Sequence, residues 1–315
     1  MRVIRSLAML GFALASAVTA NADEIDWKKV DATLGIAGSL RPGEVHFYAI
    51  PRFDLRLTVD GVAVKPAAFG GYIAFTPAHN GTMMMGDLVL TDTEVNPVMT
   101  KLLEGGVEIS ALHNHFLRAS PTIWFMHIGG HGDPVQMVGA LRNALSLSNT
   151  PFEPPVAAAG PSSGMDLDTA TIDAAMGARG QAFAGIYQVR VPRRDPIAHA
   201  GVPVPQAMAW GNIVQFQPTG AGRAAVMGDF VVSGNEVNPL IRALRASGIE
   251  VTAIHSHMLT EEPRIFYVHF WANDDATELA QGLRAALEKR CESKLIATTD
   301  PQIPIVTGFS VRPAA

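Results

Sequence analysis

Residues 107–128 read VEISALHNHFLRASPTIWFMHI, and residues 249–270 read IEVTAIHSHMLTEEPRIFYVHF. In both stretches two histidines stand two residues apart, and a third follows a turn that contains proline. Each histidine of the first stretch has a counterpart in the second at a constant offset. Of the chain's 10 histidines, these stretches hold His113, His115, His127, His255, His257 and His269.

Alternating hydrophobicity predicts a strand that leads into the first two histidines. Apolar and polar residues alternate from Val107 to Ala111, which is the pattern of a half-buried strand. His113 and His115 continue the phase of the apolar residues, so we expect both rings on the same face as these residues. The apolar run from Ile123 to Ile128 predicts a second, buried strand.

A hairpin between these two strands would gather three imidazoles. If the hairpin is centred on Ser120, His127 lies opposite His113 and diagonal to His115, and opposite Cβ atoms are about 5 Å apart. A register shifted by two residues keeps the rings on one face, whereas a shift by one does not. Three neutral imidazoles with an open position are a common zinc site and also suit copper, nickel or iron.

The pattern therefore predicts two pseudo-equivalent metal sites, one in each copy. The alternative is that the histidines are ordinary hydrogen-bonded side chains, although burying three imidazoles on an apolar face is costly without partners. The predicted ligands are His113, His115 and His127 in the first copy, and His255, His257 and His269 in the second.

The repeat extends well beyond the histidines and predicts a tandem duplication. Val30-Asp31-Ala32, for example, returns as Ile172-Asp173-Ala174. Each half reads as a short helix, three or four strands and then a β-α-β-β-α core. We predict an α+β fold with a largely antiparallel sheet in each half, the halves packing as an intramolecular pseudo-dimer. The expected parts are domains 24–147 and 166–290, a Pro/Ala/Ser-rich linker 148–165 and a C-terminal tail 291–315.

The N-terminal residues 1–22 resemble a secretory signal peptide. Arg2 and Arg5 precede an apolar run from Leu7 to Val18, and a cleavage site of small residues ends at Ala22. The run is too short to span a membrane, and no later segment is long enough. We expect a periplasmic or secreted protein without a transmembrane segment.

The charge composition of the chain indicates which classes of molecule it binds. The formal net charge is −5, so the chain lacks the excess of basic residues that nucleic-acid binding favours. We expect a small-molecule or cell-envelope ligand and no nucleic acid. Cys291 is the only cysteine, which rules out an intramolecular disulfide.

Glu94 and Glu236 occupy equivalent positions in the two halves and are candidate catalytic groups. Asn96-Pro97 predicts a helix start, because asparagine caps helices and proline fits their first turn. Glu94 would then lie just before that helix, where unpaired amides stabilise a carboxylate. The alternative role is a general base or a further metal ligand beside the histidines.

Several motifs resemble the LppY/LpqO family of exported bacterial proteins. They include residues 86–90 (GDLVL), 94–98 (EVNPV), 111–115 (ALHNH) and 126–128 (MHI), and the resemblance covers nearly the whole mature chain in both halves. The resemblance implies an exported protein and no particular activity. This chain departs from the lipoproteins that gave the family its name, because no cysteine follows the apolar run.

Two functions of different kinds follow from these observations. The first is an exported metal-binding protein, with zinc expected before copper, nickel or iron, which would extend to a metal-dependent hydrolase acting on a small or cell-envelope substrate. The alternative is a non-catalytic envelope module whose histidines are structural. Metal analysis of protein purified without a histidine tag would separate the two.

Overall fold

The computed structural model describes residues 25–79, 81–152, 165–193, 195–208 and 211–289. The predicted signal peptide, the C-terminal tail and most of the predicted linker lie outside these residues. The first half contains α1 (Trp27–Leu34), β1 (Ser39–Arg41), β2 (Val45–Ile50), β3 (Thr58–Val59), β4 (Val62–Ala63), the 3₁₀ helix η1 (Pro66–Ala68), β5 (Gly71–Ala78), β6 (Gly81–Thr91), α2 (Asp92–Glu104), β7 (Glu108–His113), β8 (Ala119–Ser120), β9 (Ile123–Gly132) and α3 (Pro134–Leu145).

The second half repeats this order. It contains α4 (Thr169–Met176), β10 (Gly180–Phe183), β11 (Ile186–Val191), β12 (Ala198–His199), β13 (Val202–Pro203), η2 (Gln206–Met208), β14 (Asn212–Gly220), β15 (Arg223–Ser233), α5 (Gly234–Ala246), β16 (Glu250–His255), β17 (Glu261–Glu262), β18 (Ile265–Asp275) and α6 (Ala276–Glu288).

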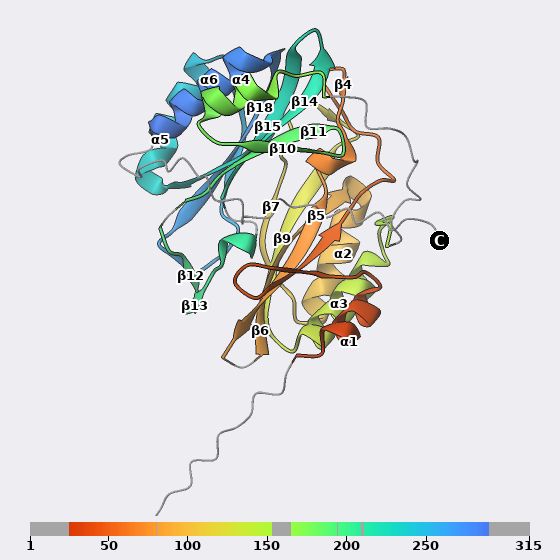
Figure 1. Cartoon of the computed structure of the whole chain (residues 1–315). Helices are drawn as coiled ribbons and strands as arrows, with labels where there is room; N and C mark the ends of the chain where they lie inside the picture. Colours follow the sequence, from red (N-terminus) through yellow and green to blue (C-terminus); the bar gives the residue numbers. More distant parts are fainter. Residues whose placement is uncertain (1–24, 80, 153–164, 194, 209–210, 290–315) are drawn as a thin grey trace, which may run out of the picture.

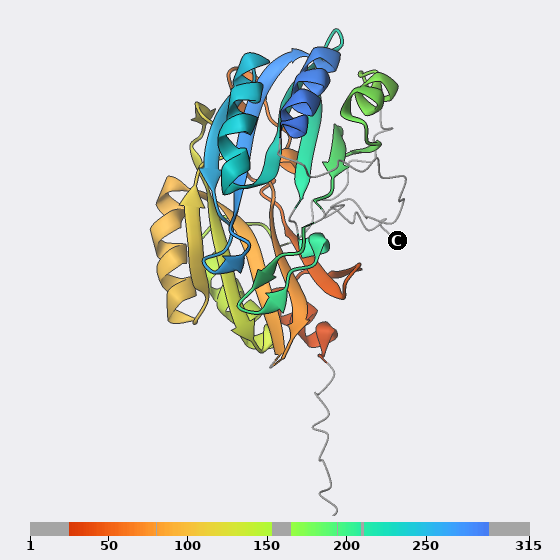
Figure 2. The ribbon, with the colours of Figure 1, turned by 90° about the vertical axis from the view of Figure 1, so that its left-hand side faces the viewer.

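Each half forms one six-stranded antiparallel sheet. The strand orders are β1-β2-β5-β6-β9-β7 and β10-β11-β14-β15-β18-β16, so the two halves have the same topology. Helices α1, α2 and α3 cover the outer face of the first sheet, and α4, α5 and α6 cover that of the second (Figures 1 and 2). The predicted α+β fold of two tandem halves is confirmed.

The inner faces of the sheets pack against each other through two apolar clusters, each built from both halves. One cluster contains Phe47 and Met83 of the first half with Met258 and Tyr267 of the second. The other contains residues such as Phe116, Phe125 and Val89 with Met227 and Trp271.

Short hairpins strengthen this packing. Asp60 follows β3 and accepts a hydrogen bond from Trp271 Nε1 of the other half, and Figure 1 shows β12 and β13 beside the first half.

A β-bulge near the start of β7 sets the direction of the histidines. Ile109 pairs with Ile128 and Ala111 pairs with His127, so Ser110 is the extra residue between two ladder positions. Ile109 packs on the helix-side core, whereas His127 faces the other half. The prediction that the histidines lie on the same face as the apolar residues before them is therefore wrong. The extra residue of the bulge turns the following side chains from the helix side of the sheet to the side that faces the other half.

The predicted hairpin register is also wrong by two residues. His113 pairs with Phe125, and His127 pairs with Ala111 rather than with His113. A shift of two leaves the side chains on the same face, so the three histidines of this half still converge. The second half has the same bulge, with Ala253 opposite His269.

Helix α2 begins five residues before the predicted start, at Asp92 rather than at Pro97. Thr91 caps it, and Thr91 and Glu94 form a capping box in which each side chain bonds the other's backbone amide. Asn96 and Pro97 lie inside the helix instead of at its start. Among the described residues, no helix is long and apolar enough to cross a membrane.

Candidate metal centre

The six histidines of the repeat meet in one cluster between the two sheets. Within the first half, the ring centroids of His113 lie 4.9 Å from those of His115 and His127. Within the second half, His255 lies 5.3 Å from His257 and 4.9 Å from His269. Each predicted group of three is thus brought together, but the two groups are merged rather than separate.

Contacts between the halves are as close as contacts within them. The rings of His113 and His255 are stacked with centroids 3.5 Å apart. His115 stacks on His269 at 3.7 Å, and the reciprocal pair His127 and His257 lies at 3.8 Å. His113 and His255 are equivalent positions, so a pseudo-two-fold axis passes between their rings. The interface is isologous, as in a symmetric homodimer.

Four of these histidines form the tightest group. One ring nitrogen from each lies within 4.8 Å of those of the others, and the group contains three residues of the first half and one of the second: His113, His115, His127 and His255. The two halves therefore contribute different numbers of ring nitrogens to this group, although they have the same topology.

Several ring nitrogens of the cluster lack a hydrogen-bond partner, whereas others lie within hydrogen-bond distance of one another. His127 is 1 % exposed, and its Nε2 has no hydrogen-bond partner; the same holds for Nδ1 of His113 and of His257. The Nε2 atoms of His113 and His115 lie 2.9 Å apart, and those of His255 and His269 lie 2.7 Å apart. Buried nitrogens without partners are costly, and converging lone pairs are what a metal ion requires.

The environment keeps these imidazoles neutral. Burial, followed by the proximity of His255, lowers the pKa of His113 far below its usual value. Burial lowers the pKa of His255 to about 4. The pKa values of the other four histidines are also lowered, mainly by burial. Neutral imidazole is the form that binds metal.

In each half, one aspartate lies beside the third histidine. Asp87 pairs with His127 across the ladder, and its Oδ1 lies 3.8 Å from His127 Nδ1. Asp229 pairs with His269, but His269 Nδ1 instead contacts the Gly228 carbonyl at 3.1 Å. By position, Asp87 is therefore better placed than Asp229 to orient the histidine beside it.

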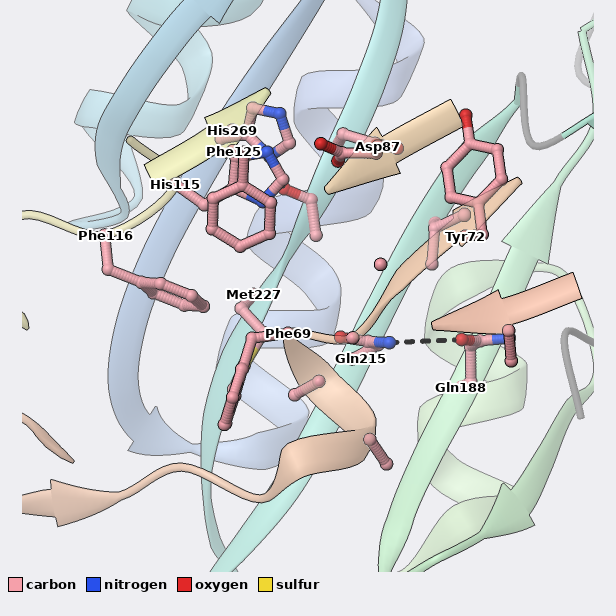
Figure 3. A pocket seen from close by; sticks show the side chains of 18 of the residues that line it. Phe69, Tyr72, Asp87, His115, Phe116, Phe125, Gln188, Gln215, Met227 and His269 are labelled. Carbon is pink, nitrogen blue, oxygen red and sulfur yellow. Dashed lines mark hydrogen bonds between the residues drawn. The ribbon is translucent and has the colours of Figure 1, made fainter. Parts of the chain in front are cut away.

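A cavity of about 140 Å³ adjoins the cluster between the sheets (Figure 3). Its walls are mostly apolar and include several phenylalanines, and its polar lining comes from both halves. The polar residues that line it are Tyr72, Asp87, His115, Gln188, Arg190, Gln215, Asp229, His257 and His269.

The structure places Glu94 and Glu236 in the capping boxes of α2 and α5. Glu94 accepts hydrogen bonds from Arg52 Nη1 at 2.9 Å and from the amides of Thr91 and Asn149 at 2.8 Å each. Thr91 lies four residues along β6 from Asp87, which is about 13 Å in a strand. Neither glutamate belongs to the histidine group or lines the cavity. The described contacts correspond to the predicted helix-terminus role and give the catalytic role no support.

Sequence reasoning missed the partner of these glutamates. Arg52 is 1 % exposed and also pairs with Asp54 at 2.8 Å. Arg193 repeats the arrangement with Asp195 and Glu236, each at 2.6 Å. The signal was present, since Pro51-Arg52 and Pro192-Arg193 are among the repeated residues. An arginine and a glutamate that both recur in the two halves indicate a buried ion pair.

The chain matches a known family in both halves. The family is described as a Domain of Unknown Function (DUF1259), and it matches residues 28–147 and 170–289. These matches cover most of the chain, so the chain belongs to this family. The description names no activity and does not mention LppY/LpqO, so that resemblance stays a proposal. No curated protein matches the chain.

Solved structures of microcompartment shell proteins show a weak similarity. The trimeric bacterial microcompartment shell protein PduB is 15% identical, with a TM-score of 0.19, over 79% of this chain and 87% of that chain. EtuB from Clostridium kluyveri is 8% identical, with a TM-score of 0.20, over 80% of this chain and 88% of that chain. At these TM-scores the similarity supports neither a fold assignment nor a function.

Proposed function

We propose that this chain binds one divalent transition-metal ion between its halves, with His113, His115, His127 and His255 as ligands. The observation that carries the proposal is the mutual approach of their ring nitrogens to within 4.8 Å. The unpartnered Nε2 of His127 supports it, because a bound ion would satisfy a buried ring nitrogen that the protein leaves without a hydrogen bond.

Zinc suits this ligand set best. Four imidazoles at converging positions match the tetrahedral coordination that zinc prefers, and copper, nickel or iron also accept imidazole. His257 and His269 would then be supporting residues; His257 packs against His127, and His269 stacks on His115. A bound ion would supply Lewis-acid chemistry only where a coordination position stays open. Four protein ligands close the site, so the proposal is metal binding without hydrolysis of a small or cell-envelope substrate.

The test is metal content measured on protein produced without a histidine tag. We expect about one equivalent of metal by mass spectrometry, and a competition titration with a chromogenic chelator should give a single tight site for zinc. His127→Gln should abolish that site. His79→Gln is the matched control, because His79 is exposed in a turn outside the cluster.

A different result would favour the non-catalytic envelope module. If the metal-free protein takes up no zinc, copper or nickel while His127→Gln still lowers the unfolding temperature, the histidines are structural. Uptake that is the same for the wild type and His127→Gln would place the metal elsewhere.

The proposal extends to export of the chain, as residues 1–22 and the resemblance to LppY/LpqO proteins suggest. Fractionation of a producing bacterium, followed by N-terminal sequencing, should find protein that starts after Ala22 in the periplasm or medium. Full-length protein confined to the cytoplasm would refute export without touching the metal proposal.

A further inference from the structure

We propose that the cavity beside the histidine cluster is a binding site for a single-ring aromatic molecule that carries a hydroxyl group, of the phenol or catechol class. This inference concerns the cavity and goes beyond metal binding, because it names a ligand that needs no metal to bind.

The size of the cavity sets the size of the ligand. Its volume of about 140 Å³ is close to that of a cavity of about 150 Å³ that holds one benzene molecule. A molecule with one ring fits, whereas a nucleotide or a peptide does not.

The walls of the cavity favour an aromatic ring. Phe69, Phe116 and Phe125 line one side in Figure 3, and Phe47 and Phe270 line it as well. Aromatic rings pack edge-to-face or offset on one another and gain energy beyond the burial of area. Phe69 follows η1, a short segment of the first half that borders the cavity.

The polar lining explains why the ligand must carry a hydrogen-bonding group. Asp87 and Asp229 both line the cavity, and Oδ1 of each is buried and lacks a hydrogen-bond partner. The Tyr72 hydroxyl lies at the same wall and is also without a partner. Carboxyl groups offer an acceptor oxygen in either protonation state, so a ligand hydroxyl would satisfy a buried group that the protein leaves unpaired.

Charge in the cavity argues against a ligand with a full charge. Asp229 lies near the half-buried Arg190, whose positive charge favours the carboxylate form of Asp229 and offsets its charge. Gln188 and Gln215, bonded to each other at 3.2 Å, complete this wall with neutral amides. A neutral hydroxyl balances such a site better than a carboxylate or an ammonium group.

The experiment uses the full chain with metal removed by a chelator, so that the outcome is independent of metal binding. Isothermal titration would compare phenol and catechol with benzene, which has the ring without the hydroxyl, and with cyclohexanol, which has the hydroxyl without the aromatic ring. We expect phenol and catechol to bind at least tenfold more tightly than either comparison molecule.

Two variants locate the binding. Asp87→Asn keeps the size of the side chain but alters its acceptors, and we expect it to weaken phenol binding about tenfold or more while leaving benzene binding unchanged. Ala49→Phe should fill the cavity and abolish binding of all ring compounds. Glu104→Gln, on the exposed surface of α2, is the control and should change nothing.

The outcomes separate this inference from the metal proposal. Phenol binding by metal-free protein, lost in Ala49→Phe, supports the cavity even if the chain takes up no metal. Absence of phenol and catechol binding at millimolar concentration overturns the inference whatever the metal content. Equal affinity for phenol and benzene, or for the wild type and Ala49→Phe, overturns it as well.

Discussion

Replacing Glu94 by glutamine tests whether this residue stabilises the fold or takes part in chemistry. The carboxylate is 4 % exposed. Its Oε2 accepts from Arg52 Nη1 at 2.9 Å and Thr91 N at 2.8 Å, and its Oε1 accepts from Arg52 Nη2 at 3.3 Å and Asn149 N at 2.8 Å. Glutamine keeps the shape but turns one of these two acceptor atoms into an NH₂ donor.

The magnitude follows from these contacts. Two donors would face an NH₂ group, and a buried donor left unsatisfied costs about 1–3 kcal/mol. The substitution also leaves the buried Arg52 guanidinium with Asp54 as its remaining charged partner. Breaking a buried ion pair from one side costs about 3–5 kcal/mol, and Asp54 reduces the loss toward the lower end. We expect Glu94→Gln to lower the free energy of unfolding by about 3 kcal/mol, a large share of the roughly 5–15 kcal/mol that proteins possess.

Urea denaturation followed by circular dichroism measures this loss. Glu104→Gln is the matched control, because Glu104 pairs with Lys101 on the exposed face of the same helix, and exposed pairs are worth about 0–1 kcal/mol. Metal content should be unchanged in folded Glu94→Gln protein. A loss below about 1 kcal/mol, or intact stability together with loss of metal, would refute the structural role and return Glu94 to the candidate site.

Further predictions concern pH, the metal and the backbone. Because the folded-state pKa of His255 is lowered to about 4, the unfolded chain binds protons first. Stability of the metal-free protein should therefore decline as the pH falls from about 6.5 toward 4, by about 1.4 kcal/mol per pH unit for each such histidine; a flat profile in denaturant titrations across this range would contradict it. Removing bound metal should lower the unfolding temperature of the wild type but not of His127→Gln, as scanning calorimetry would show. Gly228→Ala should cost about 1–3 kcal/mol, since its Cβ would meet the Ile213 carbonyl; the control Gly201→Ala, at a positive φ with open space, should cost less in the same assay.

The sequence predicted the elements that depend on local pattern. The sequence Asp133-Pro134 is an example of such a local signal, because aspartate caps helices and proline fits their first position, and α3 begins at Pro134. The tandem organisation was equally readable, since two copies of one pattern must form two copies of one fold. Convergence of three histidines within each half survived a register shift of two residues.

The merger of the two histidine groups was not predictable from these patterns. Each copy encodes the face on which its own histidines lie, and nothing in a strand pattern tells which surface will cover that face. The bulges at Ser110 and Thr252 were also hidden, because a polar residue in an alternating strand reads as an ordinary outward position. Only the structure shows that Ser110 Oγ donates to the carbonyl of His257 across the interface.

The helix start was a case of two competing signals. Thr91 and Glu94 match the capping-box pattern as well as Asn96-Pro97 matches a cap followed by proline. The capping box satisfies two backbone donors, and its glutamate also neutralises the buried Arg52. These contacts outweigh the preference of proline for the first turn.

Because His113 stacks on His255, a substitution at either position changes the surroundings of a residue in the other half. In a homodimer of a single half, every substitution would appear on both sides of the axis at once. In one continuous chain it appears on one side only, so partner positions can diverge. Where the first half has His131, the second half has Asn273, and the tightest histidine group takes three members from one half and one from the other. Because the two halves are linked in one chain, the two sides of a symmetric interface can acquire different residues, and the site between them can become asymmetric.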